Sequence, residues 1–428
     1  MKSWFKFLKS IAVVGGIALA FGACDETLDT GLACPALCPH QQATIQDTTF
    51  FAVELDTSVA GFPTLGSEPT LVIASMGDTL ETMAIVRYDS LPTTFRYSVA
   101  AEDSLIYAVD SVDLKIFFTT GDTLGAPTTL ELYDVDLGGA EDSDPSAVRT
   151  AFTPDRLLAT RTIPADSMRD TVSIPIPATR LLAKILAPSP GNRLRIGIKI
   201  NASGGGANQL SMLSSNNIGA EPVLRFRPHT DPAVAKYTVE PLSTTPENPF
   251  IRAGMRDYLL VATAPPDPPA DVIRVGGLPG RRAYIRFDIP SSILDSSNVV
   301  RATLLLTQRP NPGAPESTDS LVVQEFQVLA APAITDLTRA LLFVSRFRSQ
   351  DTVSLAAAES DVVSFEIIEL VRTWRGTTAE KTPRAMALAS PSEGSSPRLV
   401  DFYSIEAPEA LRPRLRISYL PQAGGGLP

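Results

Sequence analysis

Short apolar runs separated by turn residues follow one another along most of the chain. In the first half they lie at residues 50–55, 70–74, 82–88, 112–118, 129–135, 172–176, 194–200, 210–214 and 221–226. In the second half they lie at residues 258–262, 283–287, 302–307, 320–328, 363–368, 385–389 and 414–419. Each run has ordinary strand length and is bounded by Gly, Pro, Asp or Ser. The pattern predicts an all-β protein built from antiparallel, jelly-roll-like sandwiches.

Helical spacing is rare and confined to short segments. Residues 178–186 carry apolar positions at the helical period, and Pro188 and Pro190 follow them. Residues 369–375 predict a second short helix, and residues 334–347 are compatible with a helix packed outside a sheet. We therefore expect short helices at the periphery of the sandwiches.

The two halves repeat the same order of elements. Ile174 precedes Pro222 by 48 positions, and Phe365 precedes Pro413 by the same 48. At the front of each half, the run AIVRYD at 84–89 matches AYIRFD at 283–288. Because both ends of the unit align, two tandem copies of one sandwich explain the pattern better than one large fold.

The N-terminus has the features of an export signal. Lys2, Lys6 and Lys9 form a basic head, residues 11–21 form a short apolar core, and small residues precede Cys24. The ending FGAC resembles a bacterial lipoprotein signal, in which the cysteine is lipidated and becomes the mature N-terminus. An ordinary signal peptide and an uncleaved anchor are the alternatives. The resemblance implies an exported protein held by lipid on the cell envelope, in the outer membrane.

The remaining cysteines fit an exported chain. Cys34 and Cys38 are separated by three residues and make a candidate local disulfide. His40 follows them, but two thiols and one imidazole are an incomplete zinc set. We expect a signal peptide at 1–23, a flexible tether at 24–46, the first sandwich at 47–228, a linker at 229–247, the second sandwich at 248–420 and a loose tail at 421–428.

Charge and motifs exclude several functions. The formal net charge is -10 with no basic cluster, which argues against nucleic acid as a partner. His40 and His229 are the two histidines, one in the tether and one in the predicted linker, so no histidine-based triad can form within a sandwich. We predict that the protein is not an enzyme and carries no cofactor, with a glycosidase or polysaccharide lyase as the least supported alternative.

One loop gathers carboxylates. The segment DVDLGGAEDSDP at 134–145 contains five of them around two glycines. Oxygen ligands at this density make a candidate calcium site, although the spacing departs from an EF-hand and a solvated loop is the simpler interpretation. The candidate ligands are Asp134, Asp136, Glu141, Asp142 and Asp144.

The second half resembles the DNRLRE domain family of exported bacterial and archaeal proteins, which is related to a class of carbohydrate-binding modules. The resemblance rests on R-x-Y-x-R-F-D at 282–288, A-T-L-L-L at 302–306, the strand and helix that end at Trp374, and the closing run at 404–419. It implies a jelly-roll-like sandwich on the cell surface, with polysaccharide binding in some members. The first half shows a weaker version of these motifs.

The aromatic and basic residues of these motifs are the candidate glycan-binding residues: Tyr284, Arg286, Trp374, Phe402 and Tyr403. A structural role is the competing interpretation for each of them, as an Arg286–Asp288 surface pair or as Trp374 in the core. We expect a lipid-anchored envelope protein with a structural or interaction role. A polysaccharide-binding surface lipoprotein is the alternative, and the partner is the membrane together with a surface polysaccharide or an envelope protein.

Overall fold

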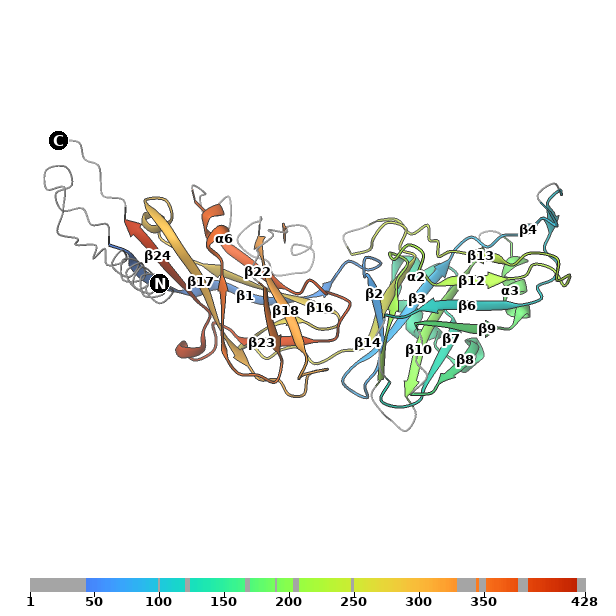
Figure 1. Cartoon of the computed structure of the whole chain (residues 1–428), viewed down its shortest axis with the longest axis horizontal. Coiled ribbons are helices and arrows are strands. Elements are labelled where there is room, and N and C mark those ends of the chain that lie inside the picture. Colours follow the sequence, from blue (N-terminus) through green and yellow to red (C-terminus); the bar gives the residue numbers. More distant parts are fainter. Residues whose placement is uncertain are drawn as a thin grey trace, which may run out of the picture.

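Two antiparallel β-sandwiches make up the part of the protein that the structure describes. The structure is a computed structural model that describes residues 44–98, 101–119, 124–165, 170–188, 191–202, 208–247, 250–328, 344–345, 352–375 and 384–421. The sandwiches lie one after the other along the long axis of the molecule (Figure 1). The predicted all-β class is confirmed. Cys24, Cys34, Cys38, His40, the signal segment, the loose tail beyond 421 and most of segment 334–347 lie outside the described residues.

In the first sandwich a large sheet packs against a small one. Among the described residues, the large sheet has the order β11, β2, β3, β10, β7, β8 with β14 also paired to β3, and the small sheet has the order β13, β12, β6, β9. Their bounds are β2 Thr70–Ser75, β3 Glu81–Tyr88, β6 Val112–Phe117, β7 Thr128–Asp134, β8 Leu157–Ile163, β9 Thr171–Ile176, β10 Leu194–Ala202, β11 Asn208–Leu213, β12 Val223–Phe226, β13 Tyr237–Val239 and β14 Asp257–Thr263. A small hairpin, β4 Thr94–Phe95 and β5 Ser104–Leu105, and the helices α2 Ala140–Ser143, η1 Pro145–Ala151, η2 Pro154–Arg156 and α3 Ala178–Ile185 complete it.

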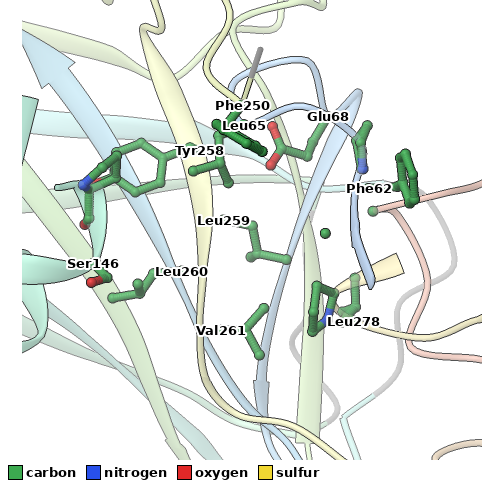
Figure 2. Close-up of a pocket in the computed structure, with 15 residues that line it drawn as sticks. Phe62, Leu65, Glu68, Ser146, Phe250, Tyr258, Leu259, Leu260, Val261 and Leu278 are labelled. Carbon is green, nitrogen blue, oxygen red and sulfur yellow. The ribbon is translucent and has the colours of Figure 1, made fainter. Parts of the chain in front are cut away.

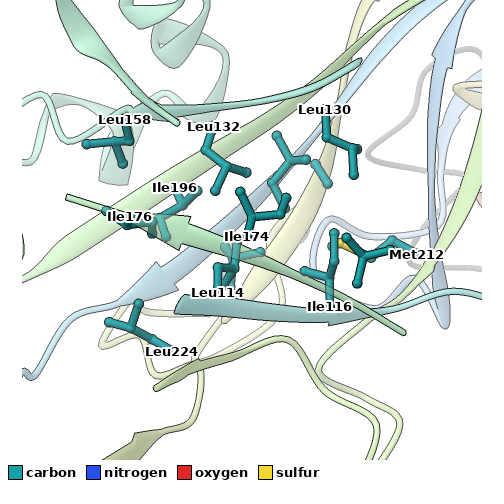
Figure 3. Packing of buried hydrophobic residues seen from close by; sticks show 14 of the residues in the cluster. Leu114, Ile116, Leu130, Leu132, Leu158, Ile174, Ile176, Ile196, Met212 and Leu224 are labelled. Atoms are coloured by element: carbon teal, nitrogen blue, oxygen red, sulfur yellow. The ribbon is translucent and has the colours of Figure 1, made fainter. Parts of the chain in front are cut away.

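Alternating residues of the two sheets form the first core. Strand β6 alternates buried and partly exposed positions, so that Leu114 and Ile116 point inward. They meet Ile174 of β9 beside them and residues of the large sheet such as Leu132 and Ile196 (Figure 3). The predicted helix at 178–186 is confirmed as α3, and it buries Leu181 and Ile185, one helical turn apart.

In the second sandwich the strand pairings form one continuous series. Among the described residues the order is β1, β24, β17, β23, β15, β16, β22, β18, β19, with β20 on β18, β21 on β17 and a further pairing of β1 with β16. The bounds are β1 Gln46–Phe62, β15 Val272–Gly276, β16 Gly280–Phe287, β17 Ser297–Arg309, β18 Ser320–Val328, β19 Val344–Ser345, β20 Thr352–Ala356, β21 Val362–Glu366, β22 Ala385–Ala389, β23 Leu399–Tyr403 and β24 Arg414–Pro421, with helices α4 Ser291–Leu294, α6 Ile368–Thr373 and η4 Glu409–Leu411.

The two sandwiches pair their strands in the same order. Strand β6 lies between β9 and β12, just as β17 pairs with β21 and β24. Strand β2 pairs with β3 and β11, just as β15 pairs with β16 and β23. Helix α3 follows β9, and α6 follows β21. The repeat found by counting along the sequence is therefore a repeat of strand topology.

The leading strands are exchanged between the two copies. Ala84 and Ala283 are equivalent in the repeat, and their partners are Leu259 of β14 and Ser58 of β1, respectively. Thus β1, from the N-terminal end of the chain, completes the second sandwich, and β14, from the middle of the chain, completes the first (Figure 1). A second edge of each sandwich is completed in the same way. Strand β13, which precedes β14, pairs with β12 of the first sandwich, and the start of β1 pairs with β24 of the second.

This exchange corrects the predicted domain boundaries. Residues 47–62, predicted in the first sandwich, pair with strands of the second, and residues 257–263, predicted in the second, pair with β3 of the first. The predicted linker at 229–247 contains β13, and its Ser243 and Thr245 are buried. The alternation in the sequence identified these segments as strands but held no information about which sheet each joins, since pairing is a long-range property.

The exchange predicts an asymmetric response to truncation. A chain that begins at Pro63 lacks β1 and leaves unpaired edges on β16 and β24. We expect amide protons of β16 and β24 to lose protection in hydrogen exchange by more than tenfold, because their backbone groups lose partners. The amides of β3 keep their protection, because β3 pairs with β14.

A chain that begins at Gln46 is the matched control, and it retains protection in both sandwiches. Loss of protection in β3 with β16 unaffected would show that the leading strands are not exchanged.

Candidate functional site

The chain crosses between the sandwiches at segment 63–69, after β1. This segment is held by backbone hydrogen bonds to a neighbouring stretch, in which Leu65 N donates to Phe250 O over 3.0 Å and Arg252 N donates to Leu65 O over 2.9 Å. A pocket of about 260 Å³ opens beside this contact (Figure 2). Its lining is mostly apolar and includes Phe62, Leu65, Phe250, Tyr258, Leu259, Leu260, Val261 and Leu278. The junction therefore holds a hollow built by both sandwiches.

Glu68 is the acidic residue of this pocket. Its side chain lines the cavity although the residue is only 3% exposed, and its Oε2 accepts a hydrogen bond from Gly66 N over 2.6 Å. Burial raises the pKa of Glu68 to about 8, and the nearby charge of Asp257 acts in the same direction. Glu68 is therefore largely protonated at neutral pH.

The turn that places Glu68 requires a glycine. Gly66 has φ of +82°, and a Cβ there would lie 2.6 Å from Met255 Cγ. Asn216 braces the same turn, because its Nδ2 donates to the backbone oxygen of Glu68 over 3.1 Å. Glu68 is thus fixed by backbone and side-chain contacts on one wall of the pocket.

The arrangement is suited to binding apolar groups. Tyr258 is the second titratable side chain among the described lining residues, and its hydroxyl donates to Pro145 O over 3.0 Å. Burial also raises the pKa of Tyr258 to about 12, so its hydroxyl stays protonated. One neutral carboxyl in an apolar wall offers a hydrogen bond to a polar end and a dry surface to the remainder of a ligand.

The predicted calcium loop covers two buried arginines. Arg87 and Arg195 lie directly opposite each other on β3 and β10. Arg195 Nη1 is 2.6 Å from Glu141 Oε1, and Arg87 Nη1 is 3.0 Å from Asp142 Oδ1. Asp89 completes the cluster with two bonds to Arg195, of 2.8 and 2.9 Å. The loop neutralises two like charges that would otherwise be buried face to face.

The other carboxylates of the loop are also engaged. Asp134 and Asp136 contact Lys184, and Asp136 accepts two bonds from Arg193. Burial alone would raise the pKa of Asp136, but the hydrogen bonds and charges of Arg193 and Lys184 lower it to about 2. Asp144 caps η1 by accepting from Ser146 N. The carboxylates of the predicted calcium loop are therefore engaged in a network of ion pairs and hydrogen bonds, and the described residues contain no cluster of His, Cys, Asp and Glu arranged to hold a metal.

The predicted glycan-binding residues do not form an open platform. Tyr284, Trp374 and Phe402 are all 0% exposed. Trp374 and Phe402 belong to the core of the second sandwich, so the structural interpretation of Trp374 is confirmed. Arg286 and Tyr403 are partly exposed, on β16 and β23. The prediction of a binding face made from these residues is wrong, because both faces of β16 are covered and aromatic residues face inward on each.

Comparisons with known proteins add little to this geometry. No protein-family profile and no curated protein sequence matches the chain. Among solved structures, a Macrobrachium rosenbergii nodavirus structure aligns over 91% of this chain and 95% of its own, at 9% identity and a TM-score of 0.16. The tandem CBM22-1-CBM22-2 domain of Paenibacillus barcinonensis Xyn10C aligns over 86% of this chain and 99% of its own, at 10% identity and a TM-score of 0.14. At such scores neither structure supports an argument about function, and the sandwich assignment rests on the strand pairing.

The buried carboxyl predicts a pH-dependent stability. Because the pKa of Glu68 is raised from 4.5 to about 8 in the folded protein, its contribution is complete below pH 4.5 and is lost as the pH rises toward 8. We expect the free energy of unfolding to fall between pH 6 and 8 with a slope of at most about 1.4 kcal/mol per pH unit from this group. Glu68→Gln removes that slope in urea titrations at several pH values.

Asp257→Asn is the matched comparison, because the pKa of Asp257 is raised only to about 6. The contribution of Asp257 to the free energy of unfolding is therefore lost as the pH rises from about 4 to about 6, before the range in which Glu68 acts. A wild-type slope above pH 6 that survives Glu68→Gln would contradict the assignment.

The charge network predicts a large effect of one arginine. Arg195→Met leaves Asp89 and Glu141 buried without their cation, and we expect a loss of roughly 3–5 kcal/mol in unfolding free energy. Arg416→Met, at an exposed pair with Asp47, is the control and costs less than about 1 kcal/mol. Chemical denaturation measures both. Added calcium leaves the midpoint of the wild-type protein unchanged; a calcium-dependent rise would instead favour a metal site in the loop.

Proposed function

We propose that the protein is a lipid-anchored protein of the bacterial cell envelope, in the outer membrane, with a structural or interaction role. The observation that carries the proposal is the reciprocal exchange of β1 and β14. Since each sandwich is completed by a strand from the other half of the chain, the two form one continuous body rather than two beads on a linker. A body of this kind is suited to holding a surface away from a membrane.

The exchange also gives the body an orientation. The predicted tether at 24–46 leads directly into β1, whose Gln46 pairs with Tyr419 of β24. The second sandwich then lies nearest the membrane, although it is mostly formed by the C-terminal half of the sequence. A tether of this length spans at most about 80 Å when fully extended. The first sandwich, with its β4–β5 hairpin, forms the distal end.

The proposal includes no catalytic step. His229 is the histidine within the described residues, and both of its ring nitrogens have partners: Nδ1 accepts from Asp231 N and Nε2 lies 2.9 Å from Tyr97 Oη. The described residues contain no helix long and apolar enough to cross a membrane. In the proposal, attachment depends on the lipid at Cys24. The resemblance to the DNRLRE family agrees with such a surface role.

The experiment that tests the proposal is fractionation of cells that produce Cys24→Ser. We expect the wild-type protein in the membrane fraction and the variant in the soluble fraction, because the acyl chains supply the binding free energy. Labelling with a radioactive fatty acid checks the modification directly.

Cys34→Ser is the control, since it changes a cysteine in the same tether and leaves the lipidation position intact. A Cys24→Ser variant that stays with the membrane would refute the anchor, and so would the absence of label from the wild-type protein.

A further inference from the structure

The pocket beside Glu68 is walled by both exchanged strands. Phe62 ends β1, residues 258–261 belong to β14, and Leu278 lies in the turn between β15 and β16. The volume of the pocket is about 260 Å³. An apolar cavity of about 150 Å³ in another protein holds one benzene molecule, so this pocket has room for a ring with a short substituent.

The pocket has an accessible rim and an apolar inner wall. Among its lining residues, Phe250 is 41% exposed, and Leu65 and Val261 are partly exposed. Figure 2 shows Leu259 and Val261 pointing from β14 toward Leu278, which is almost completely buried. A small molecule can therefore enter past the rim and exchange water for apolar contacts along the inner wall.

Glu68 brings one polar group into this wall. Its Oε2 accepts a hydrogen bond from Gly66 N over 2.6 Å. Its Oε1 is not among the solvent-shielded atoms that lack a partner, and no side chain of the described residues bonds to it. Because Oε2 is already engaged, the proton of the neutral carboxyl belongs on Oε1, and Glu68 offers a hydrogen-bond donor to the pocket.

The surroundings of Glu68 keep this donor in place at neutral pH. Burial raises the pKa of the Glu68 carboxyl to about 8, and the charge of Asp257 on the adjacent β14 acts in the same direction. The backbone amides of Gly66 and Leu259 oppose the shift but do not cancel it. Asp257 is itself held by Ser215, whose N and Oγ donate to it over 2.6 and 2.8 Å.

The charged groups beside the pocket are engaged with one another. Arg282 lies over the ring of Phe62, 3.8 Å from its centre, and gives two hydrogen bonds of 2.7 Å to Glu393. The charge that acts on Glu68 is that of Asp257 rather than that of a cation. A charged ligand would lose its water without gaining a free counter-ion from the described lining residues, so the pocket selects for an uncharged one.

We propose that this pocket binds a small, uncharged, apolar carbonyl compound, such as an aryl ketone or a short ester. The apolar part of the ligand lies against Leu259 and Leu278, and its carbonyl oxygen accepts the hydrogen of the Glu68 carboxyl. The inference goes beyond the proposed anchoring function and does not depend on it, because the pocket walls are present whether or not Cys24 is lipidated.

The test compares two probes of nearly the same shape, acetophenone and isopropylbenzene. Equilibrium dialysis measures their binding to the full-length protein in lipid nanodiscs, with empty nanodiscs as the blank. At pH 6 we expect acetophenone to bind about threefold or more tightly than isopropylbenzene, because only the ketone accepts a hydrogen bond. At pH 9 this preference disappears, since Glu68 is then mostly ionised and has lost its donor.

Two variants locate the effect. Val261→Phe places a ring in the pocket, and we expect it to weaken the binding of both probes about tenfold or more. Val362→Phe makes the same change at an exposed position of β21, and it leaves both affinities unchanged. Glu68→Gln carries an amide donor at every pH, so it binds acetophenone with the same affinity at pH 6 and pH 9.

Three outcomes overturn the proposal: acetophenone binds no more than the blank, its binding survives Val261→Phe, or the two probes bind equally at pH 6. Thermal midpoints within a few degrees of wild type show that a loss of binding is local, and the probe pair tests the wild-type protein even where a variant fails to fold. Membrane fractionation reports separately on the anchor, so failure of one proposal is distinguishable from failure of the other.

Discussion

The pairing of β1 with β16 and β24 is the constraint on which the rest of the structure depends. Strand β1 runs for 17 residues and pairs with two strands of a sandwich that the sequence reaches only after residue 250. Each backbone group in that ladder would otherwise be an unpaired edge exposed to water or to another chain. Because β14 makes the reciprocal pairing with β3, neither half of the chain contains a complete sandwich. The contacts that close each sandwich are long-range, and the second sandwich is completed only by β1, which lies on the far side of the segment that forms the first.

A second constraint is the neutralisation of buried charge. Arg87 and Arg195 face each other across β3 and β10, an arrangement that two isolated strands would not tolerate. The acidic loop that follows β7 supplies the compensating carboxylates, and Ser243 and Thr245 close the other side of Arg87. The second sandwich uses a simpler device, since Arg274 and Asp401 pair directly across β15 and β23 over 2.7 Å. Density of carboxylates therefore reflects buried arginines here, and the sequence alone does not separate that case from a metal site.

Much of the fold could be predicted from local patterns. The period of two located β6, β7 and β10, and helical spacing located α3 and α6. The equal spacings from Ile174 to Pro222 and from Phe365 to Pro413 revealed the repeat. Strands such as β8 and β23 were missed, because polar or small residues interrupt their alternation. The exchange was missed for a deeper reason: β1 and β14 occupy equivalent positions, so either satisfies the same edge in either copy. The aromatic site failed because burial on both faces of β16 gives Tyr284 the same sequence pattern as an exposed residue.

The exchange also explains why a pocket lies at the junction. A strand that leaves one sandwich to complete the other must be followed by a crossing segment, and such segments leave irregular backbone where two surfaces meet. The pocket beside Glu68 is built on segment 63–69, and Gln209 of β11 donates a hydrogen bond across the junction to Glu316. If the sandwiches were joined by a flexible linker, a ligand between them would first have to order the two bodies, at a cost in affinity. The exchanged strands impose that order during folding, so the junction is preorganised, and it is a better place for recognition than the covered sheet faces.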